Sequence, residues 1–210
     1  MGRPNKYRRR TPSRDPLMTA SYAVEGENTE VEYIDELAKD RRLGKRFKLV
    51  SSHPEPLSVV KSLVAEKKAS KAKGESRDRY IAVFDTEFSE DRRKSILKAR
   101  KLADAHGIMC IESTPSFEFW LRLHYSRNDR PYGSQEDVED DLLGYLPKYG
   151  KERGALRREM PGILTLVEVA CENARWIADH GCYSNNTEMP SLVRIIDEMR
   201  DERDARSGGQ

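Results

Sequence analysis

The chain has 210 residues and a formal net charge of +2, with 38 Lys and Arg against 36 Asp and Glu. Charged residues make up 35% of the sequence, whereas about 25% is usual for a soluble protein. No run of about 18 apolar residues occurs, so we expect no transmembrane helix. No apolar segment follows the basic N-terminus, so we expect no secretory signal. The near-zero net charge and the recurrent apolar clusters exclude a fully disordered chain.

The cysteines and histidines show no metal-binding spacing. No two of the three cysteines have C-x-x-C spacing, and the four histidines form no H-x-H or H-E-x-x-H pattern. His180 and Cys182 are close, but two possible ligands do not make a zinc site. An odd number of cysteines without an export signal is typical of a reducing compartment. We therefore expect a cytoplasmic protein with free thiols and no structural zinc.

The positive charge is concentrated at the N-terminus. The first 15 residues contain six basic side chains and one acid, a net charge of +5, so the rest of the chain carries −3. We predict a flexible basic arm at residues 1–17. Its candidate phosphate contacts are Arg8, Arg9 and Arg10, because basic arms bind the nucleic-acid backbone without needing a fixed structure. The alternative is a solvated leader without a function.

The first half of the chain alternates between two kinds of pattern. Short apolar runs predict strands at 19–24, 47–50, 80–84 and 108–111, and the run at 80–84 is typical of a strand buried on both faces. Helical periodicity predicts helices at 29–42, 57–69 and 92–106. Thr29 and Glu32 have the spacing of a capping box at the first helix. Strands that alternate with helices predict an α/β fold with a parallel sheet and helices on both faces.

The second half is predicted to be helical. Helices are expected at 117–125, 137–146, 154–158, 163–180 and 190–204. We predict an α/β core at 18–125, a helical extension at 126–204 that completes the domain, and a disordered tail at 205–210. The apolar face over 163–170 favours core packing, and a docking surface is the alternative.

Acidic residues follow the predicted strands. Glu25 follows the first strand, Asp85 and Glu87 follow the third, and Glu112 and then Glu118 follow the fourth. The carboxyl ends of parallel strands meet at one edge of a sheet, where sites form. Carboxylates gathered there repel one another, and a divalent cation relieves that repulsion. All-oxygen ligands favour Mg²⁺ or Mn²⁺. Such ions can promote phosphodiester hydrolysis.

Local roles are the alternatives for these acids. Glu25 and Glu30 suit a helix N-terminus, where the helix dipole favours negative charge. Asp85 suits a turn after a strand. Glu118 has the i, i+4 spacing for an ion pair with Arg122.

Four segments make the sequence similar to the RloB-like family of the Toprim superfamily. The family's E-G-x-x-T-E segment corresponds to residues 25–30, and the Toprim Asp-x-Asp corresponds to Asp85-Thr86-Glu87. The family's N-P-x-F-E-x-W-x-x-x-H-[FY] segment corresponds to 114–125, and a Tyr-x-Lys corresponds to 149–151. The chain departs from the family where Glu87 replaces the second Asp and Thr114 replaces the Asn.

The resemblance implies a Toprim-like open parallel sheet with a helical C-terminal extension. It implies that Glu25 is a general acid/base or metal ligand, that Asp85 and Glu87 hold Mg²⁺ or Mn²⁺, and that Glu118 binds a second metal. Lys151 would stabilise charge on the transferring phosphate. Supporting roles fall to Gly26, Glu30 and His124. For His124, flanked by leucines, packing in the core is favoured over catalysis.

The resemblance also implies a function. Members of the family are typically encoded with an ATPase of the AAA or ABC type in prokaryotic anti-phage defence, and related effectors cleave DNA or tRNA. The expected protein is a metal-dependent endonuclease acting on tRNA, other RNA or DNA in abortive infection. A homodimer is compatible with this role. The alternative is a non-catalytic, Toprim-shaped subunit that binds to or regulates an ATPase complex.

Overall fold

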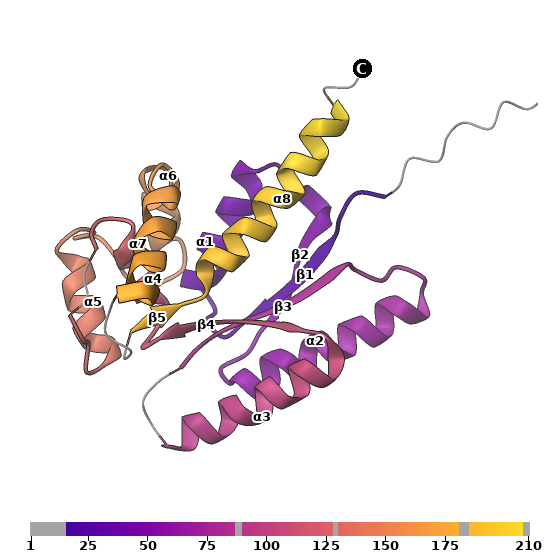
Figure 1. Ribbon diagram of the computed structural model, residues 1–210, viewed down its shortest axis with the longest axis horizontal. Helices are drawn as coiled ribbons and strands as arrows, with labels where there is room; N and C mark the ends of the chain where they lie inside the picture. The colour runs from indigo at the N-terminus through magenta and orange to yellow at the C-terminus, as the bar shows by residue number, and fades with distance from the viewer. Residues whose placement is uncertain (1–15, 87–89, 128–129, 181–184, 208–210) are drawn as a thin grey trace, which may run out of the picture.

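A five-stranded sheet forms the centre of the protein, seen in a computed structural model that describes residues 16–86, 90–127, 130–180 and 185–207. The strand order is β2-β1-β3-β4-β5, and β1 to β4 are parallel (Figure 1). The strands are β1 (Ala20–Val24), β2 (Phe47–Ser52), β3 (Arg79–Asp85), β4 (Met109–Thr114) and β5 (Asn186–Thr187). The predicted α/β fold is confirmed, and it is consistent with a Toprim-like fold. Strand β5 pairs antiparallel with β4 and was not predicted, because two residues carry no periodicity.

Helices cover both faces of the sheet. They are α1 (Thr29–Asp40), α2 (Pro56–Ala72), α3 (Glu90–His106), α4 (Phe117–Leu123), α5 (Gln135–Leu143), α6 (Ala155–Leu164), α7 (Val167–His180) and α8 (Met189–Ser207), with a 3₁₀ turn at Gly44–Arg46. Helices α2 and α3 lie side by side on one face, and α1 and α8 lie on the other (Figure 1). None of the helices in the described ranges is long and apolar enough to cross a membrane.

Strand β3 is buried on both faces, as its unbroken apolar run predicted. Tyr80, Ala82 and Phe84 belong to the hydrophobic cluster beneath α2 and α3. Ile81 and Val83 alternate with them and belong to the cluster on the opposite face. This alternation places two cores around the sheet and fixes its register, because a slip of one residue would exchange the two faces.

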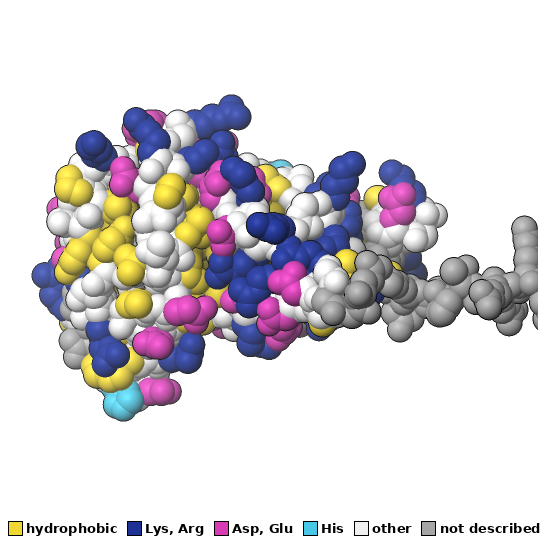
Figure 2. All heavy atoms as spheres, turned by 90° about the horizontal axis from the view of Figure 1, so that it is seen from above, with side chains coloured by type: hydrophobic (Ala, Val, Ile, Leu, Met, Phe, Trp, Pro, Cys, Tyr) yellow, Lys and Arg dark blue, Asp and Glu magenta, His cyan; other side chains and the backbone are white. Residues whose placement is uncertain are grey.

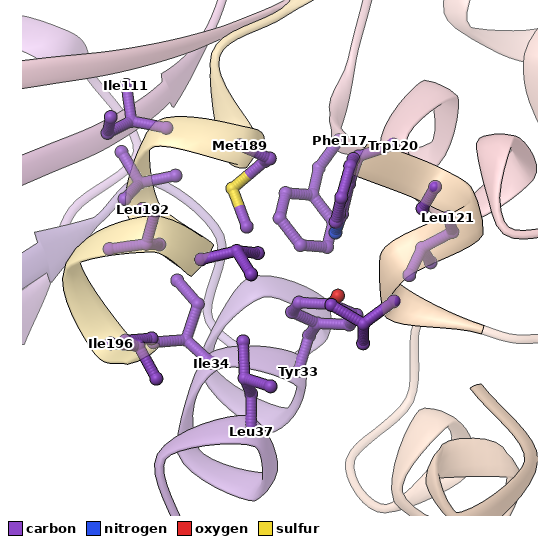
Figure 3. Close-up of a cluster of buried hydrophobic side chains, with 14 of the residues drawn as sticks. Tyr33, Ile34, Leu37, Ile111, Phe117, Trp120, Leu121, Met189, Leu192 and Ile196 are labelled. Atoms are coloured by element: carbon purple, nitrogen blue, oxygen red, sulfur yellow. The ribbon is translucent and has the colours of Figure 1, made fainter. Parts of the chain in front are cut away.

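The C-terminal helices share their core with the sheet. Figure 3 shows Met189, Leu192 and Ile196 of α8 packed among side chains of α1, β4 and α4. Trp120 and Tyr33 are fully buried in this cluster and meet edge to face with ring centroids 6.0 Å apart. Burial of side chains this large stabilises the fold by about 1.5–3 kcal/mol each.

Two expectations for the C-terminal half are wrong. The helix predicted at 163–180 is two helices, because α6 ends at Leu164 and α7 begins at Val167. The Thr165 hydroxyl donates a 2.7 Å hydrogen bond to the Gly162 carbonyl at this break. The predicted tail at 205–210 begins too early, since α8 continues to Ser207. The apolar face over 163–170 packs mainly in the core, although Val169 is 41% exposed.

The predicted capping box at α1 does not form. The N-cap is Asn28, and its side chain makes no capping hydrogen bond. The buried Glu32 carboxylate instead accepts hydrogen bonds from the backbone amides of Gly154 and Arg157, the latter at 3.0 Å. Glu32 therefore satisfies the first amides of α6, which no sequence-local rule could indicate.

Candidate functional site

The carboxyl ends of β1 and β3 meet at one edge of the sheet. Val24 is in register with Val83, and the Glu25 amide donates a 3.0 Å hydrogen bond to the Val83 carbonyl. A pocket of about 330 Å³ opens at this edge. Its lining combines the ends of both strands with α1, α4, α5 and the loop before α6: Glu25, Gly26, Glu27, Asn28, Thr29, Glu30, Pro54, Asp85, Glu118, Gln135 and Lys151. The predicted convergence of acids far apart in sequence is therefore present.

Glu25 contacts residues of two other elements, β3 and α3. Its carboxylate accepts a 3.1 Å hydrogen bond from the backbone amide of Asp85, and it forms an ion pair with Arg92 from the first turn of α3. The Arg92 guanidinium also donates a 3.1 Å hydrogen bond to the Asp85 carbonyl. The side chains of the pair are only 11% and 14% exposed. Arg92 thus joins the ends of β1 and β3 and neutralises one of the pocket's charges.

Glu30 lies in the first turn of α1 and folds back over Gly26. Its carboxylate accepts a 3.1 Å hydrogen bond from the Gly26 amide. A Cβ atom placed on Gly26 would lie 1.8 Å from the nearest Glu30 oxygen. Only glycine allows this approach, because any other residue would displace the carboxylate. The short Glu-Gly-x-x-Thr-Glu segment therefore builds a buried acid at the pocket wall.

Glu118 enters the pocket from α4 with two partners. The Tyr149 hydroxyl donates a 2.7 Å hydrogen bond to its carboxylate, and the Lys151 ammonium lies 3.7 Å from the same oxygen. Lys151 also forms an ion pair with Glu139 of α5, and its carbonyl accepts a 2.9 Å hydrogen bond from the Asn28 side chain. The alternative of a Glu118–Arg122 ion pair is excluded, because Arg122 pairs with Asp141 at 2.7 Å instead.

Burial and mutual repulsion perturb the acids. Burial raises the pKa of Asp85 well above its usual range, and the charges of Glu30, Glu118 and Glu25 add to that rise. Burial likewise raises the pKa of Glu30 to about 7, again reinforced by Glu118 and Glu25. Part of the negative charge is therefore replaced by protons near neutral pH, as expected for carboxylates that share a small volume.

Lys151 keeps its proton despite its surroundings. Its partial burial opposes the charge, but the neighbouring carboxylates of Glu139 and Glu118 outweigh burial and raise the pKa of Lys151. The pocket therefore presents one fixed ammonium beside a set of carboxylates.

The donor set suits a hard divalent cation. Five carboxylates line the pocket, and a cation there would favour their charged forms over the protonated ones. In the described residues no three acidic, histidine or cysteine side chains yet form a metal-binding group. The reason is visible in the contacts, since Glu25 faces Arg92, Glu30 faces an amide and Glu118 faces Tyr149. Binding would require some of these contacts to be exchanged.

Other predicted residues lie elsewhere. His124 is 1% exposed, and its two ring nitrogens lie 3.1 Å from the Tyr33 hydroxyl and 3.0 Å from the Trp120 carbonyl. Burial lowers the pKa of His124 to about 4, so the favoured structural role holds. Glu112 lies inside β4 and pairs with Arg100 rather than reaching the pocket.

Several predictions fall on residues that the structure does not describe. Glu87, the second acid of the Asp-x-Asp position, lies outside the described residues, as do Arg8, Arg9 and Arg10 of the basic arm. Cys110 and Cys171 are free thiols, as expected, whereas Cys182 lies outside the described residues.

Two contributors to the site were not predicted from the sequence. Arg92 is one of several bases on α3, and no local signal separates it from its neighbours. Tyr149 stands in the Tyr-x-Lys segment, and that motif could have indicated its position beside the acids. Both act as partners of carboxylates, a role that depends on tertiary contacts.

The fold and the pocket define an α/β protein with a mostly parallel sheet that gathers carboxylates at its carboxyl edge. A family model described as RloB-like protein matches residues 22–196. The chain therefore belongs to the RloB-like family. No curated protein matches the chain.

Proposed function

We propose that the chain is a divalent-metal-dependent endonuclease and the effector of an ATPase-linked prokaryotic anti-phage system. The observation that carries the proposal is the convergence of Glu25, Glu30, Asp85 and Glu118 on one pocket that also holds Lys151. Carboxylates that repel one another this strongly favour a cation over apolar or anionic ligands. Membership of the RloB-like family supports the phosphodiester substrate and the ATPase partner by analogy.

Each residue has a defined task in this proposal. Asp85, Glu25 and Glu118 would hold Mg²⁺ or Mn²⁺, with Glu87 as a further candidate. A bound divalent cation supplies electrostatic stabilisation to a phosphate group. The Lys151 ammonium would donate a hydrogen bond to a non-bridging phosphate oxygen. Glu30, whose carboxylate accepts a hydrogen bond from the Gly26 amide, would be a further carboxylate beside the cation.

The test uses the full chain, alone and with the ATPase encoded nearby. Labelled tRNA, other RNA and DNA are incubated with Mg²⁺, with Mn²⁺ or with EDTA, and products are resolved on a gel. We expect metal-dependent cleavage that falls at least 100-fold in Glu25→Ala and Asp85→Ala, since each removes a charge essential to metal binding. Glu172→Ala, at an exposed position of α7, is the matched control and should cleave normally.

The alternative role gives opposite results. A non-catalytic subunit would leave every substrate intact under all activation conditions, and isothermal titration with Mg²⁺ would show no binding at the pocket. Cleavage that survives both Glu25→Ala and Asp85→Ala would also overturn the proposal, because it would come from another site or a contaminant.

A further inference from the structure

One layer of the protein is strongly basic. Helix α2 carries four lysines and one glutamate, and helix α3 carries six Lys and Arg against three acids, so the layer has a net charge of +6. The whole chain has a net charge of only +2. Helix α5, on another side of the pocket, carries five acids and no base. Basic and acidic charge therefore lie on different helices of the folded chain, and this separation does not involve the N-terminal arm.

The basic side chains lie on the outward faces of both helices. On α2, Val60 and Leu63 are buried, and Lys61 and Lys68, two turns apart, are exposed on the other side. On α3, Ile96 and Ala99 are buried. Eight bases of the layer are exposed, and six of them have no ion pair within the described ranges. These six, here called the α2/α3 basic surface, are Lys61, Lys68, Lys71, Arg93, Lys98 and Lys101. Since α2 and α3 pack side by side (Figure 1), these residues belong to one layer of the protein.

Only two exposed bases of the layer are paired within the described ranges. Lys94 pairs with the acids at positions 90 and 91, and Arg100 pairs with Glu112 of β4. The opposite layer differs. Figure 2 looks onto the side of α6 and α8 and shows Lys and Arg interspersed with Asp and Glu. Ion pairs such as Arg194–Glu198 and Arg206–Glu202 account for this mixture. The α2/α3 layer therefore differs from the opposite layer in its excess of basic charge, +6 over the two helices.

The N-terminal ends of α2 and α3 lie beside the pocket. Pro54, just before α2, lines the pocket, and Arg92 in the first turn of α3 pairs with Glu25. The Ser95 hydroxyl donates a 2.9 Å hydrogen bond to Glu55, which joins the two helix starts. Each helix has 17 residues and so extends about 25 Å from this end. That length covers about seven base pairs of a duplex.

We infer that the α2/α3 basic surface binds the phosphodiester backbone of a nucleic acid and directs it to the pocket. The inference rests on the proposed function for what happens to the nucleic acid at the pocket. Binding of the nucleic acid to the α2/α3 basic surface does not depend on the proposed function. Flexible lysines without acidic partners suit a contact that follows phosphates rather than base sequence. The layer that attracts phosphate lies beside the pocket, whose carboxylates repel phosphate.

The experiment measures binding without catalysis. Fluorescence anisotropy of a labelled 20-base-pair DNA duplex and a labelled 20-nucleotide RNA is followed with the full chain in EDTA, from 50 to 200 mM NaCl. The test variant is Lys61→Glu/Lys98→Glu/Lys101→Glu. The control, Arg158→Glu/Arg175→Glu/Arg194→Glu, makes the same change in charge at exposed positions of α6, α7 and α8. Thermal unfolding verifies that both variants fold.

We expect the test variant to bind at least tenfold more weakly at 100 mM NaCl. Its plot of log affinity against log salt should be less steep by about 3, roughly one per lost phosphate contact. The control should bind within threefold of wild type. The duplex and RNA arms show which nucleic acid is preferred. Equal losses in both variants, no loss in the test variant, or binding to anionic phospholipid vesicles but to neither nucleic acid would overturn the inference.

These results are separable from those on the proposed function. Normal binding by the test variant, together with metal-dependent cleavage by wild type, would reject the surface and keep the nuclease. Weakened binding by the test variant, with no cleavage under any condition, would keep the surface and reject the nuclease.

Discussion

Replacement of Glu30 by glutamine tests whether the pocket acids repel one another. The pKa of Glu30 is about 7 in the folded protein against 4.5 for a free carboxyl group. The folded state holds the Glu30 proton more tightly than the unfolded state does. The contribution of Glu30 to the stability of wild type is therefore fully present below pH 4.5 and is lost as the pH rises through 7. A rise of about 2.5 pKa units corresponds to about 3 kcal/mol, at 1.36 kcal/mol per unit.

Glutamine keeps the shape of the protonated side chain and cannot ionise. Its carbonyl oxygen can still accept the hydrogen bond from the Gly26 amide. We therefore expect Glu30→Gln to be more stable than wild type by about 2–3 kcal/mol at pH 8, and to differ little from it at pH 4.5. The side chain is only 7% exposed, so solvent screening removes little of this effect.

The measurement is urea denaturation in EDTA at pH 4.5, 6 and 8. The difference between the variant and wild type is compared at each pH, so that other titrating groups cancel. Glu172→Gln, at an exposed site, should shift the free energy of unfolding equally at all three values. If Glu30→Gln is no more stable than wild type at pH 8, or if its advantage does not grow with pH, the electrostatic reasoning about this pocket is wrong.

Three further predictions follow from the same contacts. Arg92→Ala releases Glu25, so Mg²⁺ should raise its melting temperature more than that of wild type, whereas Arg93→Ala, an exposed neighbour, should match wild type in thermal unfolding. Gly26→Ala places a Cβ 1.8 Å from a Glu30 oxygen, and should lower stability in urea by about 1–3 kcal/mol, less so when Glu30→Ala is also present. Glu32→Gln weakens the cap on α6 and should cost about 1–2 kcal/mol at neutral pH in the same assay.

The fold could be predicted where residue patterns are local. Strand β3 follows from five consecutive apolar residues, and the helices of the first half follow from their periodicity. Short or interrupted elements escaped prediction, because their boundaries depend on tertiary contacts. Strand β5 has two residues and exists because β4 offers a free edge. The break between α6 and α7 interrupts a run of apolar residues that reads as one helix.

The site could be predicted in its composition but not in its pairing. Strand ends and motifs located Glu25, Asp85 and Glu118 at one edge, because parallel strands bring their carboxyl ends together. The partners of these acids arrive from distant elements, as Arg92 does from α3 and Tyr149 from the loop before α6. A long polar side chain can reach several possible partners, and the tertiary packing determines which of them it contacts.

The distribution of charge links the pocket to the α2/α3 basic surface. Residues 16–210 carry a net charge of −3, and since α2 and α3 carry +6, the remainder carries −9. A phosphate backbone attracted by one layer would therefore meet repulsion at the pocket beside it. A divalent cation among Glu25, Asp85 and Glu118 would reverse the sign of the potential there, because one Mg²⁺ offsets two carboxylates. On this reasoning nucleic acid binds weakly at the pocket in EDTA, and metal should tighten binding of wild type but not of Asp85→Asn.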